Sequence, residues 1–321
     1  MDTIYYLIQN MLPVAVPLLL VALGGMFSER SGVINIGLEG IMLFGAFFGC
    51  LTVYGIQRSG MGPQTILLIA MLVSAIAGII FSMLLSFAAV NMKADQTISG
   101  TALNMLVPAI VLLFSKMKFN SDGITTDVNF YIQQVPGLSS IPVIGDLFFK
   151  KTYITVYIGF LFLVIATIIF YKTKFGLRLR SCGEHPQAAD SVGINVYVMR
   201  HAGVALSGFL GGIGGFFYSV GVMDGNANGH TGVAGFGFLA LAVMIFGQWK
   251  PIKIMFAALF FAFLRILAYS VALIPFLHNM GINQTYFKML PYVATMIVLI
   301  FTSQKSRAPK AEGIPYDKGR R

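Results

Sequence analysis

Long apolar runs separated by short polar segments make up most of this sequence. A helix needs about 20 mostly apolar residues to cross the hydrocarbon core of a bilayer, so each run is a candidate membrane span. The pattern predicts an all-α, polytopic helical membrane protein with about nine transmembrane spans, or eight to ten. The range arises because one run is short and another contains a charge and several glycines. The runs lie near 4–27, 33–56, 65–90, 96–115, 152–171, 202–222, 232–247, 254–275 and 289–303.

The polar segments divide the chain into a transmembrane domain over 1–303 and a basic tail over 304–321. Within the domain, residues 117–151 form the longest polar segment. Its stretch at 141–149 is apolar with basic neighbours, which favours a short helix on the membrane surface. The tail is polar and contains prolines, so we expect it to be disordered. The start MDTIYYL has no basic region, so no removable signal peptide is expected.

Composition and charge add an orientation to this picture. Of the residues, 57% are hydrophobic and 11% charged, and the mean hydropathy is +0.80. The net charge is +10, and most of the 22 Lys and Arg lie on one side if the spans alternate around 172–201. Basic residues favour cytoplasmic loops. The segment 172–201 and the tail are therefore expected in the cytosol and 117–151 outside, and the positive charge does not imply a nucleic-acid partner.

The basic segment 172–201 contains one short helix-like stretch. Pro186 suits a first helical turn and Gly193 suits the position just past a helix end. Ala188, Ala189 and Val192 are expected to cluster on one side. A short helix with defined ends, presented to the cytosol, is a candidate partner contact. The alternative is an ordinary loop that contains one helical turn.

Small residues recur every four positions along the next span. They are Gly203, Ser207, Gly211, Gly215 and Ser219. Helices in lipid associate through close backbone approach at such stripes. The pattern leaves two interpretations open, which are tight packing within one subunit and an interface between subunits.

Glu39 lies inside an apolar run, with Asn35 one helical turn before it. A carboxylate in a membrane span is costly unless it faces a cavity or a partner. Glycines around Glu39 indicate a bent or interrupted span, and interrupted spans often line transport pathways. The alternatives are that Glu39 is solvated near the cytosolic end or pairs with Arg30.

Three further polar residues lie in predicted spans. Asn104 and Thr97 could hydrogen-bond a polar solute or could link helices to each other. Arg265, near the middle of its span, could be a structural counter-charge, could extend toward the membrane surface or could meet Glu39. The sequence does not rank these roles for Arg265.

Motifs for catalysis are missing. There is no GxxxxGK[ST] phosphate loop and no GxGxxG, so the chain is not expected to bind ATP itself. The four histidines lack metal-ligand spacing, and a disulfide between Cys50 and Cys182 is not expected because one is predicted in a span and the other in the cytosol. An intramembrane serine protease is an alternative raised by ALSGF around Ser207, although Ala205 replaces the first glycine of GxSG. We expect no catalytic residue, metal or cofactor.

Two segments carry a resemblance to a known family. They are FSERSGVINIGLEGIMLFGAFFG and GLRLRSCGEHPQAADSVGINV, followed by the glycine-rich span. The chain resembles permease subunits of ABC importers, in the nucleoside and simple-sugar branch of the branched-chain amino acid and ribose permease superfamily. SERSGVINIGLEG is similar to nucleoside-type permeases, whereas ribose-type relatives have a GIDLSVG-like segment there. The length is similar to the shorter of two paired permeases.

The resemblance implies a coupling helix over 184–194 that docks on a cytosolic ABC ATPase. The implied contact residues are Glu184, His185, Pro186, Ala188, Ala189, Val192 and Gly193. It also implies a second, different permease subunit, an extracytoplasmic substrate-binding lipoprotein and a location in the bacterial plasma membrane.

The expected function is therefore that of a permease subunit of an ATP-driven nucleoside importer, which forms half of the translocation pathway. Residues Asn35, Glu39, Thr97 and Asn104 are the predicted pathway residues. The alternatives are a sugar or branched-chain amino acid permease, an ATP-independent secondary transporter and an intramembrane enzyme.

Overall fold

The structure, a computed structural model, describes residues 2–134, 145, 149–229, 232–270 and 308–319, with scattered residues between 287 and 296. Helices dominate these residues. They are α1 (Asp2–Arg30), α2 (Leu38–Ile56), α3 (Pro63–Ser86, continued by the π-helical turn Phe87–Asn91), α4 (Gln96–Phe119), α5 (Ile154–Lys172), α6 (Lys174–Glu184), α7 (Pro186–Ser191), α8 (Val196–Val222), α9 (Phe236–Phe246) and α10 (Pro251–Tyr269).

Seven of the described helices are long and apolar enough to cross a membrane, namely α1 to α5, α8 and α10. The apolar run at 232–247 is not one continuous span. Its helix α9 has 11 residues, which at a rise of about 1.5 Å per residue reaches only about half of a ~30 Å hydrocarbon core. The predicted span at 289–303 lies almost wholly outside the described residues, so the count of about nine is not confirmed.

Two small antiparallel sheets depart from the all-α prediction. Strand β1 (Gly123–Ile124) pairs with β4 (Ala227–Asn228), and β2 (Tyr131–Gln134) pairs with β3 (Lys150–Tyr153). These segments lie outside the long helices, where backbone N–H and C=O groups must find other partners. The predicted surface helix over 141–149 falls almost wholly on residues that are not described.

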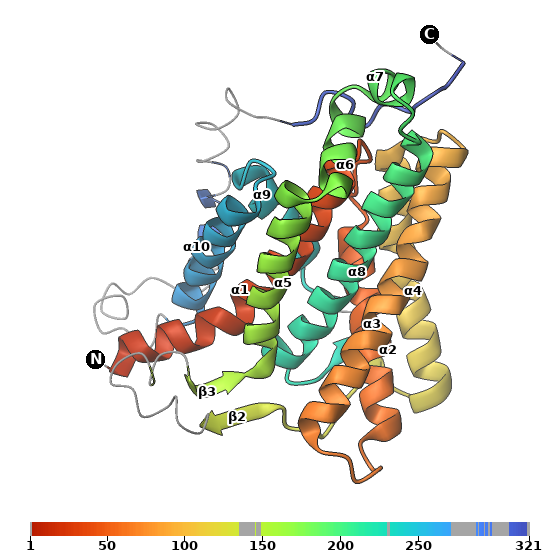
Figure 1. Cartoon of the computed structure of the whole chain (residues 1–321). Helices are drawn as coiled ribbons and strands as arrows, with labels where there is room; N and C mark the ends of the chain where they lie inside the picture. Colours follow the sequence, from red (N-terminus) through yellow and green to blue (C-terminus); the bar gives the residue numbers. More distant parts are fainter. Residues whose placement is uncertain are drawn as a thin grey trace.

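The long helices lie side by side in one bundle with two distinct ends (Figure 1). Strands β2 and β3 lie at one end, called the strand end here. Helix α7 lies at the other, called the α7 end. Helices α9 and α10 flank one side of the bundle, and α2, α3 and α4 flank the other.

Helix α8 lies at the centre of the packing and contacts α1, α2 and α3. Its small residues Gly203, Ser207, Gly211 and Gly215 are all buried within this one subunit. A Cβ atom added at Gly215 would overlap the backbone carbonyl of Met42 on α2. The stripe therefore lets α1 and α2 approach the α8 backbone closely, and Gly208 and Gly212 beside it do the same for α3.

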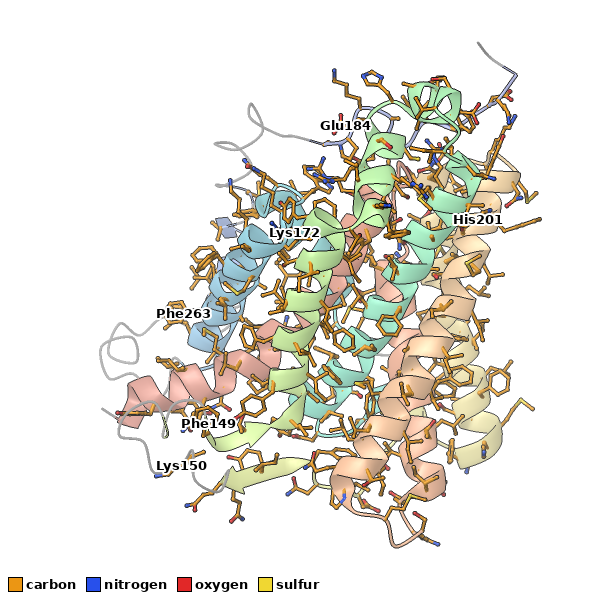
Figure 2. All side chains as sticks on the ribbon, viewed as in Figure 1. Phe149, Lys150, Lys172, Glu184, His201 and Phe263 are labelled. Atoms are coloured by element: carbon orange, nitrogen blue, oxygen red, sulfur yellow. The ribbon has the colours of Figure 1, made fainter. Side chains whose placement is uncertain are left out.

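Positive charge is concentrated at the α7 end. The described basic residues there are Arg30, Lys93, Lys172, Lys174, Arg178, Arg180, Arg200, Lys250, Lys253, Lys310 and Lys318, against Arg58, Lys116, Lys118, Lys150 and Lys151 at the strand end. Figure 2 labels Lys172 and Glu184 toward the α7 end and Lys150 at the strand end. The segments predicted to share one side of the membrane thus do lie together.

The tail is ordered where it is described, which contradicts the prediction of a disordered end. Residues 308–319 pack across the α7 end, and Ala311 and Tyr316 are buried there. The prediction was wrong because it used only the overall polar composition of the tail. A few apolar side chains and backbone groups of the tail nevertheless pack on or hydrogen-bond to the bundle.

The packing of α8 predicts a difference between two glycines. Gly215→Ala should destabilise the protein by about 1–3 kcal/mol, because its Cβ atom overlaps α2 and forces the helices apart. Gly55→Ala, on α2, should not destabilise it, because nothing lies within 4 Å of the added atom and alanine favours a helix. The measurement is the apparent Tm of each purified variant in detergent. Equal shifts for the two variants would contradict the role of the close α8 packing.

Candidate functional site

The chain leaves the helical path between α1 and α2, at residues 31–37. Gly32 has φ +97°, a conformation that suits glycine and ends α1. Backbone groups in such an interrupted segment need partners inside the protein, since a bilayer offers no water. The side-chain oxygen of Gln96 on α4 accepts a hydrogen bond from the Ile34 amide at 2.7 Å. The interruption is thus stabilised by a polar side chain that the sequence analysis had not singled out.

Asn104 supplies a second pair of bonds to the same segment. Its amide nitrogen donates to the carbonyl of Ile36 at 2.8 Å, and its amide oxygen accepts from the Gly40 amide at 2.8 Å. One side chain thereby closes the gap where α2 begins. Of the two roles left open for Asn104, linking helices is the one present in this conformation.

Glu39 binds the start of the half-length helix α9. Its two carboxylate oxygens accept hydrogen bonds from the amides of Gly235 at 2.8 Å and Gly237 at 2.6 Å. The N-terminus of a helix favours negative charge through its free N–H groups and its dipole. The alternative pairing of Glu39 with Arg30 is wrong, because Arg30 lies 3.3 Å from the carboxylate of Glu184.

Helix α9 is one half of an interrupted passage through the bundle. The described residues before it, 223–229 and 232–235, are not helical. Among them, the Gly225 carbonyl lies 3.5 Å from the sulfur of Cys50, and Gly235 bonds to Glu39 at the start of α9. Two non-helical stretches therefore lead to Glu39, residues 31–37 from the α7 end and these residues from the strand end.

Asn35 is fully buried beside this meeting point. Its amide nitrogen donates to the Ser207 hydroxyl on α8 at 2.8 Å. Its amide oxygen has no hydrogen-bond partner among the described residues. A buried acceptor without a partner is a candidate site for a water molecule or a solute group. Ser207 is engaged by Asn35 and packs under the backbone of α1, so this serine has a packing role.

Of two other candidates, Thr97 lies apart from this cluster and Arg265 lies at its edge. Thr97 is exposed on α4, and its carbonyl accepts a hydrogen bond from the Thr101 hydroxyl at 2.9 Å. The guanidinium of Arg265 lies 4.1 Å from the ring centroid of Phe236, the first residue of α9. Arg265 thus contacts the cluster through an aromatic ring.

At the α7 end, the structure agrees with the start and stop signals Pro186 and Gly193, but α7 is shorter than the implied helix over 184–194, because Glu184 is the last residue of α6. Helix α7 has Pro186 in its first turn, and Gly193 has φ +83° just past its end. The expected shared face is wrong, however. Ala189 is buried against the chain itself, whereas Ala188 is exposed and Val192 is 75% exposed. Val192 is the apolar side chain that α7 presents outward.

At the strand end, a polar hollow of about 370 Å³ is lined in part by Asp127, Asn129, Tyr131, Tyr153 and Asp224. The rings of Tyr131 and Tyr153 meet edge to face, with centroids 5.4 Å apart. Burial raises the pKa of Tyr153, and the charge of Asp224 and the neighbouring Tyr131 add to the rise. Both phenols therefore stay neutral at physiological pH.

No cluster of His, Cys, Asp or Glu suited to a metal ion occurs in the described part of the chain. The sequence analysis named Asn35, Glu39 and Asn104 but missed Gln96, Gly235 and Gly237. The glycine-rich run GVAGFGF at 232–238 was the available signal, because closely spaced glycines let a helix start approach a carboxylate.

Comparison with known proteins agrees with a transport role for this fold. The family model described as branched-chain amino acid transport system / permease component matches residues 7–299. NupQ, a guanosine ABC transporter permease protein of Bacillus subtilis, is 44% identical over 96% of this chain and 95% of its own length. NupC, a nucleoside ABC transporter permease protein of Lactococcus lactis, is 41% identical over 99% of both chains.

NupB, another nucleoside ABC transporter permease protein of Lactococcus lactis, is 26% identical over 94% of this chain and 83% of its own length. No solved structure matches the chain. The family match covers nearly all of the bundle, including both interrupted segments and α7. The chain is a multi-pass membrane protein that belongs to the family of branched-chain amino acid transport system permease components.

Proposed function

We propose that this chain is a permease subunit of an ATP-driven importer for nucleosides in the bacterial cell membrane. The observation that carries the proposal is the nearly full-length similarity to NupQ and NupC, which are named for guanosine and nucleoside transport. The second Lactococcus permease, NupB, also matches along most of this chain. This supports a complex of two different permeases, each forming half of the pathway.

The other partners follow from the same proposal. ATP hydrolysis takes place on a cytosolic ABC ATPase that docks at the α7 end, and a substrate-binding lipoprotein delivers the nucleoside at the strand end. The excess of basic residues at the α7 end supports this orientation, because basic residues favour the cytoplasmic side.

The cluster around Glu39 is the proposed moving part of the pathway. Glu39 holds the start of α9, and Asn104 holds the start of α2. Half-helices joined by polar bonds at membrane depth can separate and rejoin as a pathway opens. When they separate, the free oxygen of Asn35 and the N–H groups of α9 become available to the hydroxyl and base groups of a nucleoside.

Coupling to the ATPase runs through α7 and α8. Residues 192–195 connect the two helices directly. A movement of α7 therefore acts on α8, and α8 is packed against α1, α2 and α3. The ATPase contact is assigned to the exposed side of α7, where Val192 lies.

The substrate class is tested by uptake into vesicles that contain the reconstituted complex. Labelled guanosine should accumulate only when ATP is present on the side of the vesicle membrane that carries the ATPase. Excess uridine or adenosine should compete with guanosine better than glucose or leucine does. Competition by glucose or leucine alone would assign the chain to the sugar or amino-acid alternative. Accumulation without ATP would favour a secondary transporter.

Glu39→Gln should reduce nucleoside uptake about tenfold, because a hydrogen bond to a charged group contributes about 1.5–3 kcal/mol and the variant weakens the link to α9. The ATPase and second permease should still co-purify. Thr97→Ala is the comparison variant, because Thr97 is exposed away from the Glu39 cluster, and its uptake should remain near normal. Loss of the assembled complex in Glu39→Gln would indicate a purely structural carboxylate.

Val192→Arg should weaken co-purification of the ATPase about tenfold or more, because a charge replaces an apolar contact at the centre of an interface. Gln187→Arg, at an exposed polar position of the same helix, should have a smaller effect. Normal association and uptake of Val192→Arg would show that this side of α7 does not contact the ATPase.

Orientation is tested by single cysteines at Ser191→Cys and Asp127→Cys, in a background with Cys50→Ala and Cys182→Ala. Both positions are exposed and lie at opposite ends of the bundle. In intact cells an impermeant maleimide should label the second and spare the first. Labelling of both positions from outside would overturn the assigned topology.

A further inference from the structure

The C-terminal segment 308–319 crosses the α7 end and bonds to two separate elements through its backbone. The Ala311 amide donates to the carbonyl of Gly183 on α6 at 2.9 Å. The Gly313 amide donates to the carbonyl of Gly32, in the interrupted segment, at 3.3 Å. The segment therefore links the region before α7 to the interruption after α1.

A buried arginine of α8 depends on the same segment. Arg200 is 1% exposed, and its Nη1 donates to the carbonyl of Ile314 at 2.9 Å. Its Nε and Nη2 atoms have no hydrogen-bond partner among the described residues. Losing the Ile314 carbonyl would remove the one hydrogen bond recorded for a buried cation, which is strongly unfavourable. The segment is thus held where it is by α8 itself.

Tyr316 fills the space behind α7. It is 4% exposed and packs in one cluster with Cys182 of α6, Ala189 of α7 and Val196 of α8. Its ring also meets that of Tyr197 edge to face, with centroids 5.4 Å apart. Tyr316 therefore belongs to a buried cluster that joins all three helices around the α7 turn.

Polar contacts fix both ends of the segment. Asp317 lies 3.0 Å from the ammonium of Lys93, and Lys318 lies 3.8 Å from the carboxylate of Asp190 on α7. Toward the other end, burial raises the pKa of Glu312, while its interaction with Glu29 and the charge of Arg30 lower it.

Helix α7 cannot hold its position without such contacts. It has six residues, and helices this short are unstable on their own in water. Pro186 and Ala189 are its buried residues, and Ala189 packs in the Tyr316 cluster. The orientation of the exposed side, including Val192, therefore depends on the Tyr316 ring.

We infer that residues 308–319 form a strap that positions α7 for its partner, with Tyr316 as the positioning residue. The inference rests on the proposed ATPase contact of α7 for its functional consequence. The strap itself is a property of the permease alone and can be tested separately.

The strap is tested through Cys182, which is fully buried in the same cluster as Tyr316. Burial also raises the pKa of the Cys182 thiol, which slows its reaction with maleimides. In full-length permease carrying Cys50→Ala, Cys182 should be protected from an impermeant maleimide applied at the α7 end. Tyr316→Ala should expose it and raise the labelling rate about tenfold or more.

Two variants serve as matched comparisons. Tyr316→Phe keeps the ring and should retain most of the protection. Lys310→Ala changes an exposed side chain of the same segment and should leave labelling unchanged. Equal protection of Cys182 in Tyr316→Ala and the parent would overturn the strap, whatever the protein transports.

The functional consequence is measured in the assembled complex with its ATPase. Tyr316→Ala should lower the number of nucleosides transported per ATP hydrolysed about tenfold. The reason is that even a small displacement of the α7 contact reduces how well ATP hydrolysis is coupled to transport. Tyr316→Phe should restore most of this ratio, and the size-exclusion profile of Tyr316→Ala should match the parent. An unchanged ratio with Cys182 exposed would separate the strap from coupling and overturn its positioning role. If no variant, including the parent, transports nucleosides, the proposed function fails while the labelling result stands.

Discussion

The absence of water from the bilayer core is the constraint on which this structure depends. Every backbone amide and carbonyl that leaves a helix inside the membrane must find a partner in the protein. The chain leaves its helices at 31–37 and in the described residues between α8 and α9, and both stretches run from an end of the bundle toward Glu39. Polar side chains supply several of the partners: Gln96 and Asn104 bond the first interruption, and Glu39 bonds the start of the helix that follows the second. Bonds of this kind hold a helix end firmly in one conformation, yet they can break without unfolding a span. The same residues thus keep the bundle intact and leave it able to move.

Close packing at α8 determines where such motion can go. Gly215 and its neighbours allow α1, α2 and α3 to touch the α8 backbone, and interiors packed this densely shift as units instead of deforming smoothly. Asn35 joins the first interruption to α8 through Ser207. A shift of α8 relative to α2 must therefore disturb the Asn35 bond, which lies next to the polar cluster at Glu39.

Local chemistry made some of these features predictable from the sequence and left others out of reach. Pro186 and Gly193 mark the ends of α7 because their backbone preferences act at their own positions. The burial of Ala189 could not be predicted, because it depends on Tyr316 far along the chain. An apolar run such as 232–247 indicates that a segment is shielded from water, but it does not indicate where a helix begins. That start is decided by Glu39, which lies in another run. The prediction of a disordered tail was wrong for a related reason, because the composition of a segment does not show which distant residues pack against it.

The position of Tyr316 in the sequence, well after α6, α7 and α8, also orders events during biosynthesis. A ribosome makes the chain from its N-terminus, so α6, α7 and α8 are in place well before residue 316 exists. Until translation has passed residue 316, the space beside Ala189 and Cys182 is unfilled and Arg200 lacks the Ile314 carbonyl. The surface around α7 is therefore completed only after the described helices have been made. A chain truncated before residue 314 retains these helices and lacks that surface, so assembly can distinguish the two forms.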